Sequence, residues 1–251
     1  MPTGKSFVLN LGAQQRHGYN ISHSFPAVDL AYSPRLDMGF NRQYSTWYDE
    51  QPHLHTSSEE YFILLQGRLD LLINGEPFSV EPYQLLGIRA NVPHQIVGVK
   101  TPITNFFLRI PGGSSDKVLL NKFDPSAHGQ GCMQIDLRQP HDNYLLGASL
   151  PQTDPNYSSF FDFTCAWDAD PAEEWKNEVM HFHTNREEFY MVMKGSLDFA
   201  LDDSVITVSS NQVLAVRPNS VHNIVGGKGP VDVLFVRVPG GQGDKTVVAS
   251  G

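Results

Sequence analysis

The first half of the chain places two histidines and a glutamate close together, as His53, His55 and Glu60. Imidazole nitrogen and carboxylate oxygen are common ligands of divalent metal ions. Residues i and i+2 of a strand face the same side, so both histidines can point at one ion. Glu60 begins an apolar run, and a carboxylate entering an apolar interior needs a cation or hydrogen-bond donors. The spacing indicates a metal site, with ordinary strand-end polar groups as the alternative.

The same pattern returns 128 residues later. Residues 53–120 align with residues 181–248 without a gap, and 26 of the 68 aligned positions are identical. Self-similarity at a fixed offset indicates two copies of one domain. Each copy has three histidines and one glutamate, and the third histidine lies on a later strand that can reach the ion from the opposite wall. The predicted metal ligands are His53, His55, Glu60 and His94 in the first copy and His181, His183, Glu188 and His222 in the second.

Turn-forming residues accumulate in the stretch NKFDPSAHGQG, residues 121–131, so we place the domain boundary near residue 127. The predicted domains are residues 1–127 and residues 128–251. Outside the turns, β-branched and aromatic runs broken by glycine predict short strands. Each domain is therefore expected to be a compact antiparallel barrel.

Ahead of the histidines the two copies differ in spacing. Trp47 lies six residues before the first histidine pair, whereas Trp167 lies fourteen residues before the second. This difference predicts an insertion of about eight residues in the second copy, within residues 168–179. The best helix signal of the chain, residues 171–179, lies in the same segment, with a proline at its start and acids in its first turn.

These motifs resemble those of a known family. The order His-x-His, four residues, Glu, six residues, Gly resembles the first motif of the cupin superfamily, and it occurs in both copies. RANVPHQIVG, residues 89–98, and RPNSVHNIVG, residues 217–226, resemble the second motif. Asn91 and Asn219 stand where the family usually has a glycine, and Asn tolerates positive φ better than most residues. The resemblance implies an all-β bicupin with two jelly-roll barrels in tandem, related by a pseudo-twofold axis.

The resemblance also implies a divalent metal ion in each barrel. Four protein ligands would close a tetrahedral zinc site, whereas on an octahedral ion they leave two adjacent positions for substrate and water or dioxygen. We therefore favour iron, manganese or nickel, with zinc, copper and cobalt as alternatives. We assign the role of catalytic base to Glu60 and Glu188, which would take a hydroxyl proton from the substrate.

The preferred function is a metal-dependent oxygenase of the quercetin dioxygenase kind, acting on a small aromatic or enolic substrate. Apolar and aromatic pocket walls favour an organic substrate. The expected walls are Phe62, Leu64 and Ile96 in the first copy and Tyr190, Val192 and Ile224 in the second. Oxalate-converting bicupins carry an arginine just before the His-x-His, whereas this chain has Glu50-Gln51 and Glu178-Val179 there. This departure counts against oxalate as the substrate.

Two other functions stay open at this point. An isomerase, decarboxylase or lyase would use the ion to polarise a carbonyl group, and Arg186 would hold an anionic group where the first copy has Ser58. A non-enzymatic protein that binds metal or a small ligand is the other alternative. Arginine and aspartate also recur in both copies, and we expect them to form an ion pair that closes each barrel. These pairs are Arg109 with Asp116 and Arg237 with Asp244.

The composition limits the partners of the protein. A net charge of -9 and the lack of clustered Lys and Arg argue against a nucleic-acid partner. No stretch reaches the roughly 18 apolar residues of a membrane span, and the N-terminal residues lack the features of an export signal. We therefore expect a cytoplasmic protein that binds a small-molecule substrate and forms a homodimer by analogy with other cupins.

Overall fold

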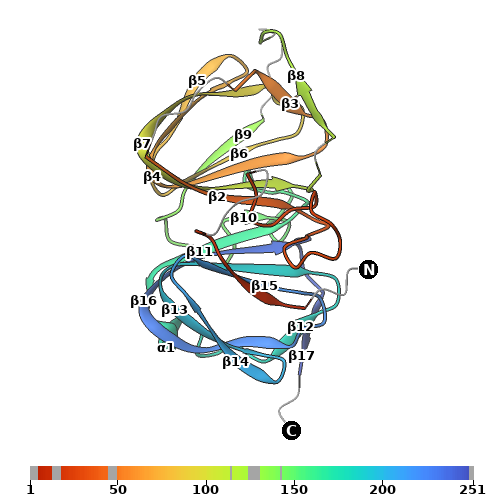
Figure 1. The fold of residues 1–251 in the computed structure, drawn as a ribbon, viewed down its shortest axis with the longest axis vertical. Helices are drawn as coiled ribbons and strands as arrows, with labels where there is room; N and C mark the ends of the chain where they lie inside the picture. The colour runs from red at the N-terminus through yellow and green to blue at the C-terminus, as the bar shows by residue number, and fades with distance from the viewer. Residues whose placement is uncertain are drawn as a thin grey trace. The chain divides into compact units, whose positions relative to one another are not determined.

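The computed structural model describes residues 5–12, 18–44, 50–113, 115–123, 131–141 and 143–248. The chain forms two compact units, in agreement with the repeat (Figure 1). One unit is Gln14–Gln139, and the other combines Met1–Ala13 with Pro140–Gly251. We call them the first barrel and the second barrel. Among the described residues, no helix has the length and apolar character needed to cross a membrane.

The first barrel is built on an eight-stranded antiparallel sheet with the order β8-β3-β7-β4-β6-β9, in which β2 pairs with β7 and β5 with β4. Two long strands, β4 and β7, carry most of the pairing, and the short strands surround them. The strands are β2 (Asp37–Gln43), β3 (His53–His55), β4 (Glu59–Ile73), β5 (Glu76–Val80), β6 (Gln84–Ile88), β7 (His94–Ile110), β8 (Lys117–Leu119) and β9 (Cys132–Asp136).

The second barrel repeats this arrangement in a nine-stranded sheet with the order β1-β15-β13-β16-β11-β10, in which β12 pairs with β16 and β17, and β14 with β13. Its long strands β13 and β16 correspond to β4 and β7. The elements are β1 (Phe7–Asn10), β10 (Leu146–Gly147), β11 (Asp162–Ala169), α1 (Pro171–Glu174), β12 (His181–His183), β13 (Glu187–Leu201), β14 (Ser204–Ser209), β15 (Gln212–Val216), β16 (His222–Val238) and β17 (Lys245–Val247). The two jelly-roll barrels predicted from the sequence are confirmed.

The long strands bend because each contains a glycine that no other residue could replace without strain. Gly67 in β4 has φ +84°, and a Cβ atom there would lie 2.5 Å from the carbonyl oxygen of Lys100. Gly195 in β13 has φ +70° and would bring a Cβ atom within 2.7 Å of the Lys228 carbonyl oxygen. The register shifts of both strand pairs fall around these glycines. One continuous strand can therefore contribute to two sides of its barrel.

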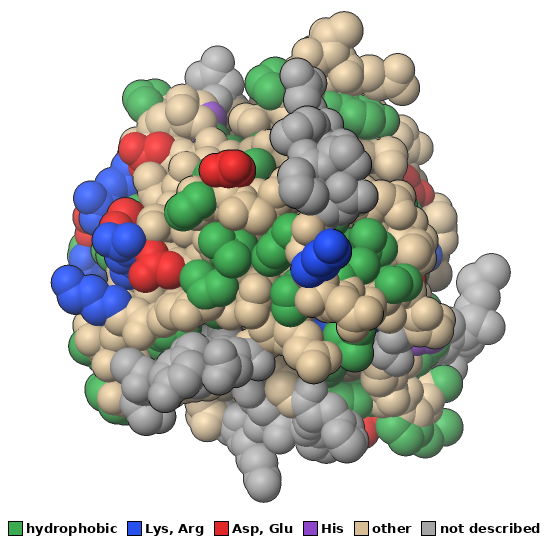
Figure 2. Space-filling model, turned by 90° about the horizontal axis from the view of Figure 1, so that it is seen from above, with side chains coloured by type: hydrophobic (Ala, Val, Ile, Leu, Met, Phe, Trp, Pro, Cys, Tyr) green, Lys and Arg blue, Asp and Glu red, His purple; other side chains and the backbone are tan. Residues whose placement is uncertain are grey.

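Apolar side chains at alternate strand positions fill each barrel. β4 and β13 have the same sequence of buried and exposed positions over all 15 residues, which shows that the repeat extends to packing. The core residues include Leu64, Leu71, Val80 and Leu86 in the first barrel and Val192, Phe199, Val208 and Leu214 in the second. On the face shown in Figure 2, Lys and Arg lie beside Asp and Glu, next to a group of hydrophobic side chains.

The two units differ from the expected division into residues 1–127 and 128–251. Strand β9, which follows residue 127, pairs with β6 of the first barrel. Strand β1, at the start of the chain, pairs with β15 of the second barrel. An open sheet edge accepts any strand of suitable register, and a sequence repeat does not reveal which strand it takes.

The helix is also shorter than expected. Helix α1 covers Pro171–Glu174 instead of residues 171–179, and it begins where the Asp170 side chain accepts a hydrogen bond from the Ala172 amide. The expectation for the turns of the second motif is confirmed, because Asn91 has φ +64° and Asn219 has φ +68°. The asparagines therefore take the left-handed conformation that glycine usually provides.

Candidate metal centres

In the first barrel the four predicted ligands come together at the end of the sheet. Strand β3 places His53 opposite His94 of β7, and Glu60 enters from the start of β4. All four side chains are buried, and their ligand atoms lie within 4.8 Å of one another. A group of three imidazoles and one carboxylate at this spacing has the dimensions of a metal site.

Two of the imidazoles are held by backbone carbonyls. Nδ1 of His53 lies 2.9 Å from the Gln51 carbonyl oxygen, and Nδ1 of His94 lies 2.9 Å from the Val92 carbonyl oxygen. A carbonyl oxygen only accepts hydrogen bonds, so each Nδ1 carries the proton and donates it. In the neutral imidazole the lone pair is then on Nε2, which is the nitrogen available to bind a metal ion.

The third imidazole is held by a carboxylate. Nδ1 of His55 lies 2.9 Å from Asp116 Oδ1, and Asp116 also accepts hydrogen bonds from the Ser58 amide at 2.8 Å and the Ser58 hydroxyl at 2.5 Å. On the other side of the ring, Nε2 of His55 is 2.9 Å from Glu60 Oε1, yet it is buried without an aligned hydrogen-bond partner. A buried nitrogen facing an acceptor without a hydrogen bond is what a cation between the two would explain. The residues therefore fit a divalent metal ion.

The environment sets the protonation states that such an ion requires. Burial raises the pKa of Glu60, but the imidazoles of His55 and His94, at 2.9 Å from its two oxygens, outweigh burial and hold that pKa well below the usual range of a carboxyl group. Burial lowers the pKa of His53, and the neighbouring His94 adds to this effect. Near neutral pH the carboxylate is ionised and His53 is neutral, which are the forms that bind metal.

In the second barrel the corresponding side chains also come together. The ligand atoms of His181, His183 and Glu188 lie within 4.8 Å of one another, and all three side chains are buried. His222 lies outside this tightest group, but its Nε2 is 2.7 Å from Glu188 Oε2 and it pairs with His181 across the sheet. Burial, with a contribution from His222, lowers the pKa of His181 to about 4. The structure thus brings all eight predicted residues to two sites.

The residue that orients His183 does so differently from the residue that orients His55 in the first barrel. Nδ1 of His183 lies 3.0 Å from the backbone oxygen of Asp244, whereas its distance to the Asp244 carboxylate is 3.9 Å. That carboxylate instead accepts hydrogen bonds from Thr184 and from the Asn185 amide at 3.0 Å. Arg186, which stands where the first barrel has Ser58, lies 3.8 Å from it. The carboxylate is therefore turned away from the imidazole.

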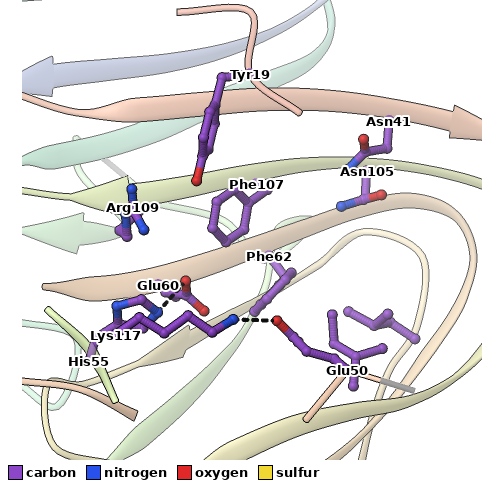
Figure 3. A pocket seen from close by; sticks show the side chains of 12 residues that line it. Tyr19, Asn41, Glu50, His55, Glu60, Phe62, Asn105, Phe107, Arg109 and Lys117 are labelled. Carbon is purple, nitrogen blue, oxygen red and sulfur yellow. Dashed lines mark hydrogen bonds and ion pairs between the residues drawn. The ribbon is translucent and has the colours of Figure 1, made fainter. Parts of the chain in front are cut away.

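The first barrel contains a cavity of about 250 Å³ that reaches its ligand group. His55 and Glu60 form part of its wall at one end, and Asn41 and Asn105 lie at the other end (Figure 3). The remaining wall combines aromatic, aliphatic and charged side chains. These are Tyr19, Glu50, Phe62, Leu69, Ile96, Phe107, Arg109 and Lys117.

The second barrel contains a cavity of about 360 Å³, but none of its predicted ligands is among the described residues of the wall. Tyr190, which corresponds to Phe62, lines this cavity and donates a hydrogen bond of 3.2 Å to Glu188. Tyr190 therefore contacts both the cavity and the carboxylate. The other residues of the wall are His141, Asn143, Tyr144, Thr164, Cys165, Ala166, Glu174, Trp175, Glu178, Val233 and Phe235.

The predicted walls are confirmed in part. Phe62, Ile96 and Tyr190 line the cavities. The other three predicted wall residues, Leu64, Val192 and Ile224, are buried in the core clusters of their barrels. Residues at the same parity of a strand face the same interior, but the sequence does not show how far along the strand the cavity extends.

The predicted ion pairs are wrong. Arg109 pairs with Asp37 at 2.5 Å, and Arg237 pairs with Asp162 at 2.6 Å. Asp116, the expected partner of Arg109, supports His55 instead. The two aspartates that the sequence analysis missed are 125 residues apart, and Tyr19 and Tyr144 of the two cavities have the same offset.

A second offset of 125 could therefore have identified the missed residues. It also corrects the predicted insertion. The offset is 125 at Asp37 and Asp162 and 128 from His53 and His181 onward, so the second copy gains three residues instead of about eight. Trp47, on which the larger estimate rested, lies outside the described residues.

Comparison with known proteins finds one matching family model and several solved structures with a similar fold. A family model described as a cupin domain matches residues 46–102, and no curated protein sequence matches. The protein Ylba from E. coli has a TM-score of 0.59 at 11% identity, over 94% of this chain and 91% of that chain. A protein from Pseudomonas aeruginosa, described as a putative glyoxylate-induced protein, has a TM-score of 0.57 at 13% identity, over 95% and 90%. A mutant form of Bacillus subtilis oxalate decarboxylase has a TM-score of 0.56 at 12% identity, over 98% and 80%.

The class defined by the fold and the sites is a double-barrel protein with two candidate metal centres. Residues 46–102 match a cupin domain, and nearly the whole chain shares its fold with the solved structures above.

Proposed function

We propose that the first barrel is the catalytic barrel of a metal-dependent enzyme that acts on a small polar organic molecule. The observation that carries this proposal is the wall of its cavity, because His55 and Glu60 line the space a substrate would fill. In the second barrel Glu188 does not line the cavity, and the Tyr190 hydroxyl is hydrogen-bonded to it. The second centre then has a structural role.

His53, His55, Glu60 and His94 would hold the ion in the first barrel. Manganese is the first choice, because the Bacillus subtilis oxalate decarboxylase that resembles this fold has Mn(II) centres. Iron and nickel suit the same ligands. When bound, the ion would act as a Lewis acid on a substrate oxygen.

The cavity favours a small substrate with polar groups at both ends. Its volume of about 250 Å³ is below the range of most ligand pockets. At the end away from the ligand group, Asn105 is buried, and no donor among the described residues reaches its side-chain oxygen. A substrate with a hydroxyl or N–H group at that end would satisfy this oxygen.

A dianion such as oxalate is a poor match for the same wall. Arg109 is paired with the buried Asp37, and Lys117 is paired with Glu50 at 2.8 Å. Both cations of the wall are therefore already balanced by carboxylates. A substrate with at most one negative charge fits this balance better.

Glu60 is the residue that would handle protons in this barrel. It is ionised, lies in the wall, and is oriented by imidazoles at 2.9 Å on each of its oxygens. These features suit a base that takes a proton from a carbon or hydroxyl next to the polarised oxygen. An isomerase, decarboxylase or lyase is therefore the best-supported reaction class. Glu188, the other candidate base, already accepts a hydrogen bond from the Tyr190 hydroxyl.

An oxygenase is the second candidate, and the aromatic side chains of the cavity favour it. Tyr19, Phe62 and Phe107 form its middle section, and the rings of Phe62 and Phe107 are 5.4 Å apart. An enol or phenol could stack there with its oxygen toward His55 and Glu60 (Figure 3). Turnover that disappears without dioxygen would select this candidate, and turnover that persists would select the first.

The experiment compares His55→Ala with His183→Ala, using His23→Ala as an exposed histidine control. Metal content is measured by elemental analysis, and consumption of small hydroxy acids, keto acids, enols and amides is followed by NMR with and without dioxygen. We expect each ligand variant to lose about one metal equivalent. Turnover should fall at least ~100-fold in His55→Ala only. Turnover that survives in His55→Ala, or that is lost only in His183→Ala, would overturn the proposal.

A further inference from the structure

We propose that the cavity of the second barrel binds a small organic cation, such as a quaternary or protonated amine. This cavity is separate from the ligand group of that barrel and holds about 360 Å³. Three features carry the inference: the rings in its wall, the carboxylates in its wall, and the residues that replace the polar groups of the first cavity.

Four aromatic side chains from different parts of the chain meet in this wall. Tyr144 precedes β10, Trp175 follows α1, Tyr190 lies in β13 and Phe235 lies in β16. The ring of Phe235 lies 4.8 Å from that of Tyr190 and 6.5 Å from that of Tyr144. The face of an aromatic ring carries partial negative charge, and several rings around one space attract a cation that has lost its water.

The wall itself carries two acidic side chains, and Arg237, whose guanidinium lies 4.8 Å from the centre of the Tyr144 ring, is paired with Asp162. Glu174 and Glu178 contribute carboxylates, and no Lys or Arg is among the described residues that line the cavity. Glu178 accepts a hydrogen bond of 2.8 Å from the Ile224 amide, which is a neutral donor. In the first barrel the corresponding Glu50 is neutralised by Lys117. Glu178 forms no ion pair with a Lys or Arg among the described residues, and a cationic ligand beside it would offset the burial that raises its pKa.

The polar end of the first cavity has no equivalent here. Ala166 stands at the position of Asn41, and Val233 stands at the position of Asn105. The wall has thus lost two amides that can bind a neutral polar molecule. Rings, apolar groups and acids are retained, a combination that suits a cation with an apolar surface.

The test uses choline and its uncharged analogue 3,3-dimethylbutan-1-ol, which has the same shape. Binding to the metal-loaded full chain is measured by calorimetry. We expect choline to bind and the analogue to bind at least ~10-fold more weakly. Equal binding of the two, or no binding of choline, would overturn the proposal.

Variants locate the site. Glu178→Gln keeps the side-chain shape and the acceptor for the Ile224 amide, and it should weaken choline binding ~10-fold. Trp175→Leu should weaken binding by a similar factor, with the melting temperature as a check that the barrel still folds. Glu50→Gln, the matched change in the first barrel, should leave the affinity unchanged. Choline binding that responds to Glu50→Gln and is insensitive to Glu178→Gln would assign it to the first barrel and overturn the proposal.

Discussion

Position 62 of the first barrel is a phenylalanine, and Glu60 beside it forms part of the cavity wall. The corresponding residue of the second barrel is Tyr190, which lines the neighbouring cavity and whose hydroxyl binds Glu188. This hydroxyl is the basis of our proposal that a substrate reaches the ligand group of the first barrel and not that of the second. The ligand residues predict a metal centre in both barrels, and the cavity walls in front of them differ.

The two cavities also differ at the positions of Asn41 and Asn105. Asn41 and Asn105 face each other on paired strands in the first barrel, and the second barrel has Ala166 and Val233 instead. The first cavity can bind a neutral polar group, whereas the second is aromatic and acidic. Two copies of one fold can in this way keep the same ligands and select different small molecules.

The largest change in the free energy of unfolding should come from the buried arginine–aspartate pair that both barrels share. Arg109→Met and Arg237→Met each leave a fully buried aspartate, Asp37 or Asp162, without its cation. Breaking a buried ion pair from one side costs about 3–5 kcal/mol, so we expect losses of this size from both variants in chemical denaturation. Arg68→Met, which removes a half-exposed arginine, is the control and should cost less than about 1 kcal/mol. A loss of less than about 1 kcal/mol from either arginine variant would show that the buried pair does not stabilise its barrel.

An intermediate effect, on metal affinity, should distinguish the aspartates that lie behind the two ligand groups. Asp116 holds His55 directly, whereas the Asp244 carboxylate is turned away from His183. Loss of such a partner typically lowers metal affinity 10- to 100-fold. We expect Asp116→Asn to weaken manganese binding by about this factor and Asp244→Asn to change it by less than about threefold. Equal changes, measured by competition with a chelator, would contradict the difference in geometry.

The same aspartate gives a dependence on pH. Burial raises the pKa of Asp116, but hydrogen bonds from Ser58 and His55 outweigh burial and hold the pKa well below its usual value. The resulting stability is complete above the unfolded pKa of about 3.9 and is lost as the pH falls through the folded pKa. In metal-free protein, the stability gap between wild type and Asp116→Asn should therefore shrink as the pH falls below about 4. A gap that grew in acid would contradict this assignment.

The smallest effect concerns access of water. With manganese bound in one barrel at a time, His183→Ala reports on the first centre and His55→Ala on the second. The first centre should enhance water-proton relaxation more strongly, because its ligands reach the cavity. Adding Tyr190→Phe to His55→Ala should raise the enhancement of the second centre by about twofold, since only one hydrogen bond closes it. No change in that double variant would mean that other side chains seal the second centre.

The sequence by itself determined the two ligand groups and the fold that carries them. His53 and His55 alternate on one strand and recur as His181 and His183, so local spacing and one fixed offset were sufficient. Asn91 and Asn219 were likewise predictable, because left-handed backbone conformation is a local property.

Only the tertiary structure decided which residues meet across the barrels. Arg109 finds Asp37 instead of Asp116, and β1 completes the second barrel instead of the first. These choices join residues more than 70 positions apart, where strand periodicity gives the side of a sheet but not the partner or the distance along it. Whether Tyr190 covers a carboxylate or faces open space is decided in the same way. Access to the centres was therefore determined by packing, since the ligand spacing is common to both barrels.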